Sequence, residues 1–347
     1  MQKITDTMSL CEHCYRHVPA VKFEKDGAIW LSKTCPKHGY LEHLVEPNAD
    51  FYLDYNYPKH PLTSYFIEVT NRCNLTCPHC YQLPDNKSVD LPIDYIVQQV
   101  SSWPDDGYCV SLAGAEPTVR KDLDQLIRAI KAIPGKPRSI IVLTNGVNLS
   151  KIEYAEKFKD IEDLHWTVGL NHPDYQGHTV RAKQIRGIEN CVKLGFSIKN
   201  ISYTLEDLGQ LEYCLDEIHK FYPDTCKQFR IRVGVDIGRN PEGPPVYLSQ
   251  LVDATKDIAT KRNWTYRENQ STGIRAHFPI YINNIYLKLI QWPDATTIDM
   301  DEMQTETWAD LLPGKPISPL IHQVMLRDAS VNNGMMLYDV VPERYRR

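Results

Sequence analysis

The chain has 347 residues, of which 42% are hydrophobic and 24% charged, the composition of an ordinary globular protein. No apolar run is long enough to cross a membrane, and a net charge of -5 argues against nucleic-acid binding, which normally uses a basic surface. The first residues lack the basic and then apolar pattern of a secretion signal, so we expect a cytoplasmic location. In such a chain, ten cysteines indicate metal binding before disulfide bonds.

Residues 1–50 are predicted to be a separate metal-binding unit. Two pairs of ligands, Cys11-x2-Cys14 and Cys35-x2-His38, flank a short strand pattern that is interrupted by a Lys-Asp-Gly turn signal. Cys3His coordination predicts a structural zinc ribbon, with rubredoxin-like iron as the alternative because sulfur-rich tetrahedral sites discriminate poorly between these metals. The nearby histidines that could replace His38 are His13, His17 and His43.

Residues 51–63 are rich in Tyr and Pro and are predicted to be a linker. From residue 64 to 265, strand patterns then alternate with helix patterns. The strands are expected at 65–70, 108–113, 139–144, 164–170, 197–205 and 229–235. This alternation predicts the α/β class, with parallel strands and right-handed crossovers closing into a partial (β/α)6 barrel. In barrels of this kind, the working loops follow the C-terminal ends of the strands.

Residues 266–347 are predicted to form a mixed C-terminal extension. One part of it has the pattern of a β-hairpin that turns at Asn283-Asn284. Another part, residues 319–329, is expected to be a helix.

The first strand of the predicted barrel leads into Cys73-x3-Cys77-x2-Cys80. Three cysteines at any one fixed spacing are expected by chance only about 0.01 times in a chain of this composition. Three thiolates can hold three irons of a cubane and leave the fourth iron open, whereas electron-transfer clusters normally use four cysteines. An open iron can bind and reduce a substrate, much as catalytic zinc keeps a free coordination position.

This cysteine segment resembles the signature of the radical S-adenosylmethionine (radical SAM) superfamily, Cys-x3-Cys-x-aromatic-Cys, with His79 in the aromatic place. The resemblance covers roughly residues 64 to 262. It implies a [4Fe-4S] cluster whose open iron chelates S-adenosylmethionine, and reductive cleavage of that cofactor to methionine and a 5′-deoxyadenosyl radical. It also implies a small organic substrate and an external one-electron reductant such as flavodoxin or ferredoxin.

The end of the second strand is similar to the Gly-Gly-Glu-Pro segment of this superfamily, which receives the methionine amino group. The corresponding residues here are Gly114, Ala115 and Glu116, followed by proline. Ala115 departs from the pattern, so its backbone must reach the ligand without the conformational freedom of glycine. The alternative for Glu116 is that it caps the helix that begins near residue 119.

The resemblance places further cofactor contacts after the next strands. Thr144 and Asn145 belong to a segment similar to the family's Thr-Asn-Gly, and Asn171 stands where polar groups usually meet the ribose hydroxyls. Arg181 is expected to pair with the methionine carboxylate, and His79 is expected to lie beside the adenine. The simpler interpretations are an Asn-Gly turn, a solvated helix arginine and a loop histidine.

Among the scattered cysteines, Cys109 lies in the second strand and is a candidate hydrogen-atom donor to a product radical. Cys191 and Cys214 have apolar neighbours in helix patterns, where packing in the core is the expected role.

N-terminal units of the form Cys-x2-Cys…Cys-Pro-x-His-Gly precede the radical motif in a subset of the superfamily, which includes archaeal enzymes acting on pterins and on membrane-lipid chains. This chain resembles that subset in the order of its parts. Two other functions compete with that of a radical SAM enzyme: an iron–sulfur electron carrier, and a zinc-based binding module with a degenerate barrel. The first leaves the missing fourth ligand without an explanation.

Overall fold

The computed structural model describes residues 1–13, 17–54, 64–77, 80, 84–101, 109–135, 139–170, 172–233, 246–269, 277–291 and 297. Cys14, His79, Asn171 and the helix predicted at residues 319–329 lie outside these ranges. Across the ranges given, no helix combines the length and the apolar character that a membrane span needs.

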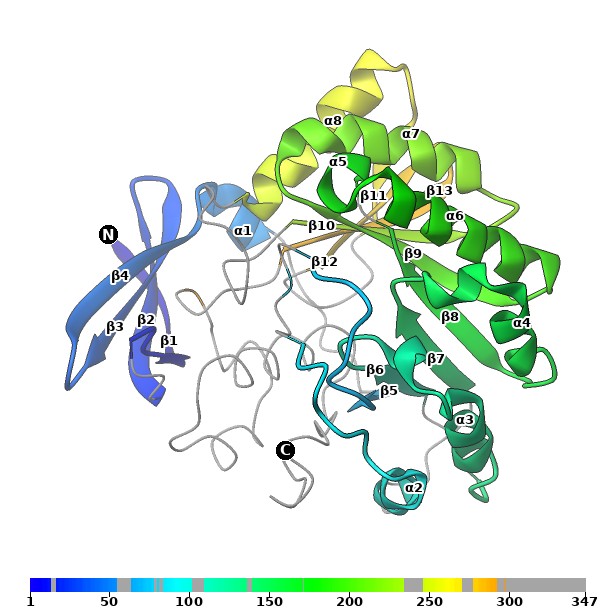
Figure 1. Ribbon diagram of the computed structural model, residues 1–347. Helices are drawn as coiled ribbons and strands as arrows, with labels where there is room; N and C mark the ends of the chain where they lie inside the picture. The colour runs from blue at the N-terminus through cyan, green and yellow to red at the C-terminus, as the bar shows by residue number, and fades with distance from the viewer. Residues whose placement is uncertain are drawn as a thin grey trace.

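The N-terminal unit is a four-stranded antiparallel sheet, drawn in blue in Figure 1. Its strands follow chain order: β1 (Gln2–Leu10), β2 (His17–Lys25), β3 (Ala28–Cys35) and β4 (Gly39–Glu46). The predicted turn between β2 and β3 is confirmed, and its two central residues, Asp26 and Gly27, have φ values of 55° and 74°. Two consecutive positive φ values are the signature of a tight type I′ hairpin turn.

The larger sheet contains the predicted parallel strands side by side in chain order. They are β5 (Ser64–Glu68), β6 (Cys109–Ala113), β7 (Ser139–Thr144), β8 (Leu164–Gly169), β9 (Ser197–Leu205) and β10 (Gln228–Val233). Each strand from β6 to β10 is parallel to the one before it, as crossover connections require. The curved sheet is therefore the partial barrel that the sequence predicted (Figure 1).

The helices of the crossovers cover one face of this sheet (Figure 1). They are α2 (Ile93–Ser101), α3 (Leu123–Lys131), α4 (Ile152–Ala155), α5 (Pro173–Gln176), α6 (His178–Lys193), α7 (Leu211–Phe221) and α8 (Leu248–Lys261). The connection between β7 and β8 has only this short helix, because α4 gives way to a 3-10 turn at Glu156–Phe158. Further 3-10 turns lie at Pro117–Val119, Asn148–Ser150 and Leu208–Gln210.

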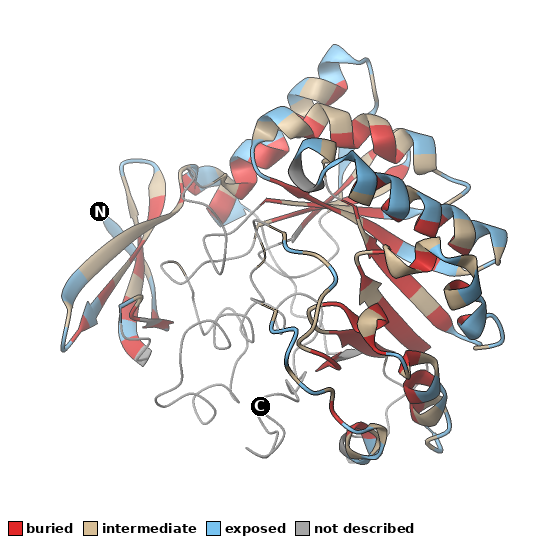
Figure 2. Ribbon diagram, in the orientation of Figure 1, coloured by how far each residue is buried: buried red, intermediate tan, exposed pale blue. Residues whose placement is uncertain are grey.

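The main hydrophobic core lies between these helices and the sheet, where Figure 2 colours the ribbon of the buried residues red. Trp166 of β8 is fully buried there and packs between Phe158, edge-on at 5.2 Å, and Phe196, stacked at 6.1 Å. Burial of such large apolar side chains is the main source of stability for this layer.

The predicted C-terminal hairpin is confirmed. Asn283 and Asn284, with φ values of 48° and 67°, turn the chain between β12 (His277–Ile282) and β13 (Ile285–Ile290). The sequence did not indicate that β13 would pair in parallel with β10 and so extend the barrel sheet, which then continues through β12 to β11 (Tyr266–Glu268). Over residues 266–291, the expected extension is thus largely part of the sheet.

The predicted linker begins with a short helix, α1 (Ala49–Asp54), which helps to attach the ribbon to the barrel. Phe51 stacks on Phe278 of β12 at 5.3 Å. The buried Glu46 carboxylate at the end of β4 accepts hydrogen bonds from the backbone N–H (3.3 Å) and the hydroxyl of Ser249, at the first turn of α8. A carboxylate at this position is also favoured by the positive end of the helix dipole.

Candidate active site

The three cysteines of the central motif lie in the loop that follows the carboxyl end of β5. All three are partly buried, and none forms a disulfide bond. The Leu75 N–H approaches the Cys73 sulfur at 3.3 Å, and the Cys80 N–H donates to the Cys77 carbonyl at 3.2 Å. Burial raises the pKa of Cys73 to about 12, and the charges of Glu116, Cys77 and Cys80 act in the same direction. Thiolates crowded in this way need a cation beside them, so the donor set fits an iron–sulfur cluster.

Backbone pairing to the end of β6 fixes the start of this loop. The Val69 N–H donates to the Ala113 carbonyl at 2.9 Å, and the Ala115 N–H donates to the Thr70 carbonyl at 3.0 Å. Gly114 lies between these two bonds with a φ of 132°, and a Cβ on it would lie 2.3 Å from the Thr70 oxygen. Only glycine fits a backbone conformation and an approach of this kind.

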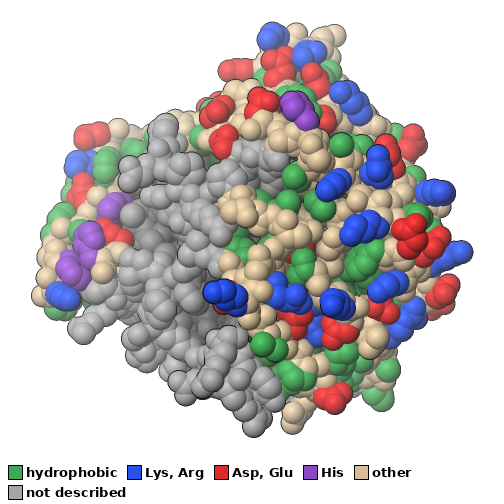
Figure 3. Space-filling view, in the orientation of Figure 1, with side chains coloured by type: hydrophobic (Ala, Val, Ile, Leu, Met, Phe, Trp, Pro, Cys, Tyr) green, Lys and Arg blue, Asp and Glu red, His purple; other side chains and the backbone are tan. Residues whose placement is uncertain are grey.

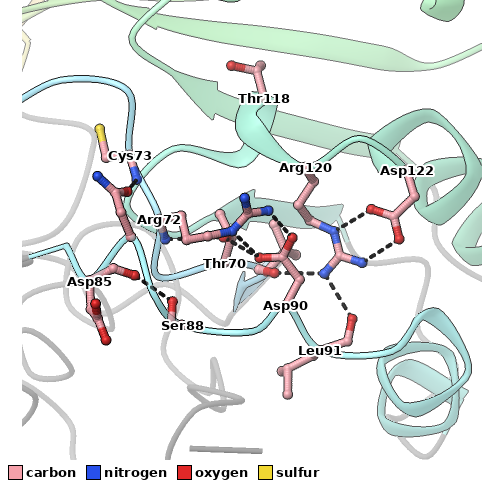
Figure 4. A network of polar contacts seen from close by, with 12 residues as sticks. Thr70, Arg72, Cys73, Asp85, Ser88, Asp90, Leu91, Thr118, Arg120 and Asp122 are labelled. Carbon is pink, nitrogen blue, oxygen red and sulfur yellow. Dashed lines mark hydrogen bonds and ion pairs between the residues drawn. The ribbon is translucent and has the colours of Figure 1, made fainter. Parts of the chain in front are cut away.

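A cluster of charged side chains, shown in Figure 4, holds the two ends of the cysteine loop together. The Asp90 carboxylate accepts hydrogen bonds from the Thr70 hydroxyl at 2.6 Å and from Arg72 Nε at 3.1 Å, and forms an ion pair with the same guanidinium. Nearer the motif, the Cys73 N–H donates to the Asn86 side chain at 2.9 Å. The first cysteine is therefore positioned by residues that come after the motif as well as before it.

Arg120 also links the two ends of the cysteine loop. Its guanidinium is buried and donates through Nη1 to the carbonyls of Val69 (2.8 Å) and Leu91 (3.0 Å), on opposite ends of the loop. Asp122 compensates its charge at 2.9 Å. A paired and fully hydrogen-bonded arginine can be buried without a large desolvation penalty.

Glu116 is buried, with an exposed fraction of 1%, and its carboxylate lies between the ends of β6 and β7. Oε1 accepts from the Thr118 N–H (3.0 Å), the Thr118 hydroxyl (2.5 Å) and the Thr144 hydroxyl (2.6 Å), while Oε2 accepts from the Asn145 N–H at 2.6 Å. Burial raises the pKa of Glu116, and these hydrogen bonds oppose that effect. Glu116 thus caps the 3-10 turn at Pro117–Val119. Among the described residues Oε2 accepts a single hydrogen bond whereas Oε1 accepts three, so Oε2 is the oxygen that can accept one more.

Asn145, at the end of β7, lies beside the first cysteine. Its Nδ2 donates to Asn74 Oδ1 at 2.8 Å and approaches the Cys73 sulfur at 3.9 Å, while its Oδ1 accepts from the Val147 N–H at 3.0 Å. The buried Gln184 of α6 supports this turn by donating to the Asn145 carbonyl at 3.1 Å. The structure therefore brings Gly114, Ala115, Glu116, Thr144 and Asn145 together with Cys73.

Two other candidate residues have different surroundings. Arg181 is buried in α6 and forms an ion pair with Glu217 of α7, whose other oxygen accepts from the Tyr213 hydroxyl at 3.0 Å. Its contact with the methionine carboxylate stays a prediction. Cys109 is the first residue of β6, at the end of the strand opposite the cysteine loop, and its sulfur accepts from the Ser139 hydroxyl at 2.9 Å. That position argues against a role as hydrogen-atom donor.

The ribbon brings together three of its four predicted metal ligands. The ligand atoms of Cys11, Cys35 and His38 lie within 4.8 Å of one another, with His38 Nδ1 at 3.3 Å and 3.6 Å from the two sulfurs. Burial opposes ionisation of Cys35, but the N–H groups of Lys37 and His38, together with Cys11, lower its pKa to about 6. A thiolate stabilised in this way is a good metal ligand.

Histidine side chains gather on the surface of the ribbon (Figure 3). Of the alternative ligands, His43 forms an ion pair with Glu12 at 2.7 Å, and the His13 ring packs edge-on against His38 at 5.2 Å. The geometry favours His38 over both, since only His38 is grouped with Cys11 and Cys35 in the part of the chain that the structure describes.

Residues 67–208 match the radical SAM superfamily, and residues 3–47 match the HMPTM N-terminal zinc ribbon domain. This match assigns the barrel region, about two fifths of the chain, to the radical SAM superfamily. The two matches fall on the barrel, with its cysteine loop, and on the ribbon, with its Cys–Cys–His group.

Two curated proteins similar to this chain are named for different compounds. The chain is 28% identical over 232 residues to 7,8-dihydro-6-hydroxymethylpterin dimethyltransferase of Methanocaldococcus jannaschii, covering 55% of this chain and 45% of the relative. It is also 28% identical over 217 residues to GTP 3',8-cyclase of Mannheimia succiniciproducens, covering 59% of this chain and 63% of the relative. The chain therefore spans less than two thirds of the length of both.

Among solved structures, Streptococcus suis SuiB bound to S-adenosylmethionine aligns with a TM-score of 0.48 and 16% identity, over 72% of this chain and 54% of that chain. A likeness this distant carries no argument about function.

Sequence reasoning missed the side chains that support the loop: Arg72, Asp90, Arg120 and Gln184. Their partners lie far along the chain or are backbone atoms, so no short motif marks them. The sequence contains only a weak sign of this support: Arg72 directly precedes the first cysteine, and Asp90 comes just before the next helix.

Asp90→Asn should destabilise the cysteine loop without removing a metal ligand. The change leaves the Arg72 charge uncompensated and should cost about 1–2 kcal/mol of the free energy of unfolding. Iron content after anaerobic reconstitution should fall, and thermal melting should begin earlier. The matched control is Asp85→Asn, which alters an exposed carboxylate of the same loop. Equal iron content and equal stability in the two variants would show that Asp90 does not stabilise the cysteine loop.

Proposed function

We propose that this protein is a radical SAM enzyme in which Cys73, Cys77 and Cys80 hold a [4Fe-4S] cluster and S-adenosylmethionine binds beside it. The observation that carries the proposal is the arrangement of three cysteines, none of them in a disulfide bond, next to Glu116 and Asn145 at the carboxyl ends of adjacent parallel strands. Working loops lie at this end of the strands in barrel enzymes. An electron carrier needs no such polar groups beside its cluster.

When bound, the cluster supplies the electron that breaks a C–S bond of S-adenosylmethionine, so that a 5′-deoxyadenosyl radical can abstract hydrogen from a small organic substrate. An external one-electron donor such as flavodoxin or ferredoxin is required to reduce it. The chain's own part is to orient the cofactor. The free acceptor position on Glu116 Oε2 suits the amino group of the methionine moiety, and the polar end of β7 at Thr144 and Asn145 forms the adjoining wall.

The relatives suggest the class of substrate. One is named for a dihydropterin and the other for GTP, and both compounds contain a 2-amino-4-oxopyrimidine ring fused to a second heterocycle. The N-terminal match to the HMPTM zinc ribbon is in line with the pterin branch of this pair. We therefore propose a fused heterocycle of the pterin or guanine type as the substrate.

We also propose that Cys11, Cys14, Cys35 and His38 hold a structural zinc ion, with iron as the alternative. The described ligands fit zinc because two sulfurs and one imidazole nitrogen already converge in the absence of a disulfide. In the described part of the ribbon, buried apolar residues form small clusters such as that of Cys11, Val18 and Cys35, so bound metal would add substantially to its stability.

Replacing Cys73, Cys77 and Cys80 together by Ala should abolish cluster binding and S-adenosylmethionine cleavage. The wild-type protein, reconstituted anaerobically, should bind about four irons at this site and form 5′-deoxyadenosine when reduced, more so with a dihydropterin or GTP present. The matched control is Cys109→Ala, which removes a thiol at the opposite end of β6 and should retain cleavage. Cleavage that persists in the triple variant would refute the proposed function.

Cys11→Ala combined with Cys14→Ala should remove the ribbon metal and lower the melting temperature, while the visible absorption of the cluster remains. His38→Ala should have the same effect, and His43→Ala should keep the metal because His43 pairs with Glu12 instead. Metal analysis and thermal denaturation provide the measurements. Loss of the iron–sulfur absorption with full retention of zinc would show that the ligands have been assigned to the wrong metal.

Glu116→Gln should weaken S-adenosylmethionine binding roughly tenfold to a hundredfold, corresponding to about 1.5–3 kcal/mol for a charge-assisted hydrogen bond shielded from water. The variant should also melt earlier, because an amide NH2 cannot accept from the donors that now surround the carboxylate. A change in stability therefore does not show whether Glu116 is only a cap or also binds the cofactor. The equilibrium affinity for S-adenosylmethionine does. If Glu116→Gln melts earlier but binds S-adenosylmethionine as tightly as the wild type, Glu116 is a cap and does not bind the cofactor.

A further inference from the structure

The sheet has a second face whose chemistry differs from that of the helix-covered face. Along β10, Phe229 and Ile231 belong to the main hydrophobic core, together with Leu215 of α7. The residues between them, Arg230 and Arg232, point to the other side because successive side chains of a strand alternate. Two arginines in one strand of a barrel sheet have no role in packing against the helices.

The strand register gathers further polar groups around these arginines. Arg230 lies opposite Lys288 of β13 on one side and Ser202 of β9 on the other, so their side chains share one face. Arg232 lies one layer closer to the carboxyl end of the strand, where its Nε donates to the Thr204 hydroxyl at 2.7 Å. Three cationic side chains from adjacent strands thus occupy one part of the inner face.

These three cations lack acidic partners in the described ranges of the chain. No ion pair involves Arg230, Arg232 or Lys288 there, and Arg230 Nε is excluded from solvent without a hydrogen-bond acceptor. The Lys288 ammonium group has only the ring of Tyr286, at 5.9 Å. On the outer surface, by contrast, lysines and arginines are interspersed with acidic side chains (Figure 3).

The cluster is electrostatically unfavourable by itself. Burial lowers the pKa of Arg230 to about 10, and the neighbouring Arg232 charge acts in the same direction. Burial likewise lowers the pKa of Lys288 to about 8, with added repulsion from Arg230 and Lys199. Like charges that are partly removed from water destabilise a folded chain unless a ligand of opposite charge compensates them.

We propose that Arg230, Arg232 and Lys288 form a binding site for a phosphate or diphosphate group of the substrate. This inference rests on the proposed function and narrows the substrate to a phosphorylated compound. A single carboxylate would compensate only one of the three charges, whereas a phosphate ester or diphosphate carries two or more. The planar guanidinium groups can also form paired hydrogen bonds with phosphate oxygens, for which arginine is better suited than lysine.

The position of the site agrees with a role as an anchor. Arg232 is the last residue but one of β10, so the anion would lie within roughly two residues, about 7 Å, of the strand ends. The cysteine loop follows the carboxyl end of β5, which lies at the same end of the parallel sheet. A phosphate held on β10 and β13 would leave the rest of the substrate to extend across the barrel mouth toward the cofactor.

The test is a calorimetric titration of the reconstituted full-length protein with inorganic pyrophosphate at low, constant ionic strength, with acetate as the reference anion. We expect saturable binding of pyrophosphate that is much tighter than that of acetate. Arg230→Gln and Lys288→Met should each weaken it at least about tenfold, since each removes a charge-assisted contact. The matched control is Arg186→Gln, which removes an exposed positive charge from the outer face of α6 and should bind like wild type.

Absence of saturable binding by the wild type, or equal affinity in all three variants, would overturn the anion site. If Arg230→Gln fails to fold, as judged by its melting curve, Arg232→Gln takes its place in the comparison. The titration needs neither S-adenosylmethionine nor a reductant. Failure of cofactor cleavage in the wild type would therefore refute the proposed function, while the titration tests the anion site separately.

Discussion

The candidate site depends on the close approach of two backbones, where residues 69–72 run beside residues 113–116. Hydrogen bonds from Val69 to Ala113 and from Ala115 to Thr70 continue the pairing of β5 and β6 beyond their ends. Gly114 allows this approach, because any Cβ at that position would collide with the Thr70 carbonyl. The cysteine loop therefore leaves the sheet in a defined direction. The resemblance to Gly-Gly-Glu-Pro has a physical basis here: Gly114 is required by this contact, whereas Ala115 is tolerated because its φ is not positive.

Charge compensation then determines which polar groups remain available near the cysteines. Asp90 is largely engaged with Thr70 and Arg72, and Asp122 is engaged with Arg120. These pairs keep the loop in place and offer little to a ligand. Glu116 differs, because three of its four described donors bond to Oε1 and only one bonds to Oε2. The same carboxylate can thus cap a turn and still receive a cation, so the two interpretations of Glu116 are compatible.

Local patterns in the sequence were sufficient for much of the fold. Apolar runs such as 139–144 marked the strands, and the pairs Asp26-Gly27 and Asn283-Asn284 marked two hairpin turns, because turn geometry depends on the residues in the turn itself. The parallel pairing of β13 with β10 was not predicted, since it depends on contacts across more than fifty residues. The pairing of Arg181 with Glu217 was missed for the same reason: an isolated arginine in a helix does not reveal its partner.

The alternation of Phe229, Arg230, Ile231 and Arg232 was a readable signal that sequence analysis passed over. A strand that is buried on both faces in an α/β barrel is usually apolar throughout, so charged residues at every second position mark a face that meets something polar. Only Phe229 and Ile231 pack against the helices. Apolar residues in place of Arg230 and Arg232 would stabilise the fold equally well. We therefore attribute Arg230 and Arg232 to the binding of an anionic ligand inside the barrel. In this chain, the fold and the chemistry use opposite faces of the same strand.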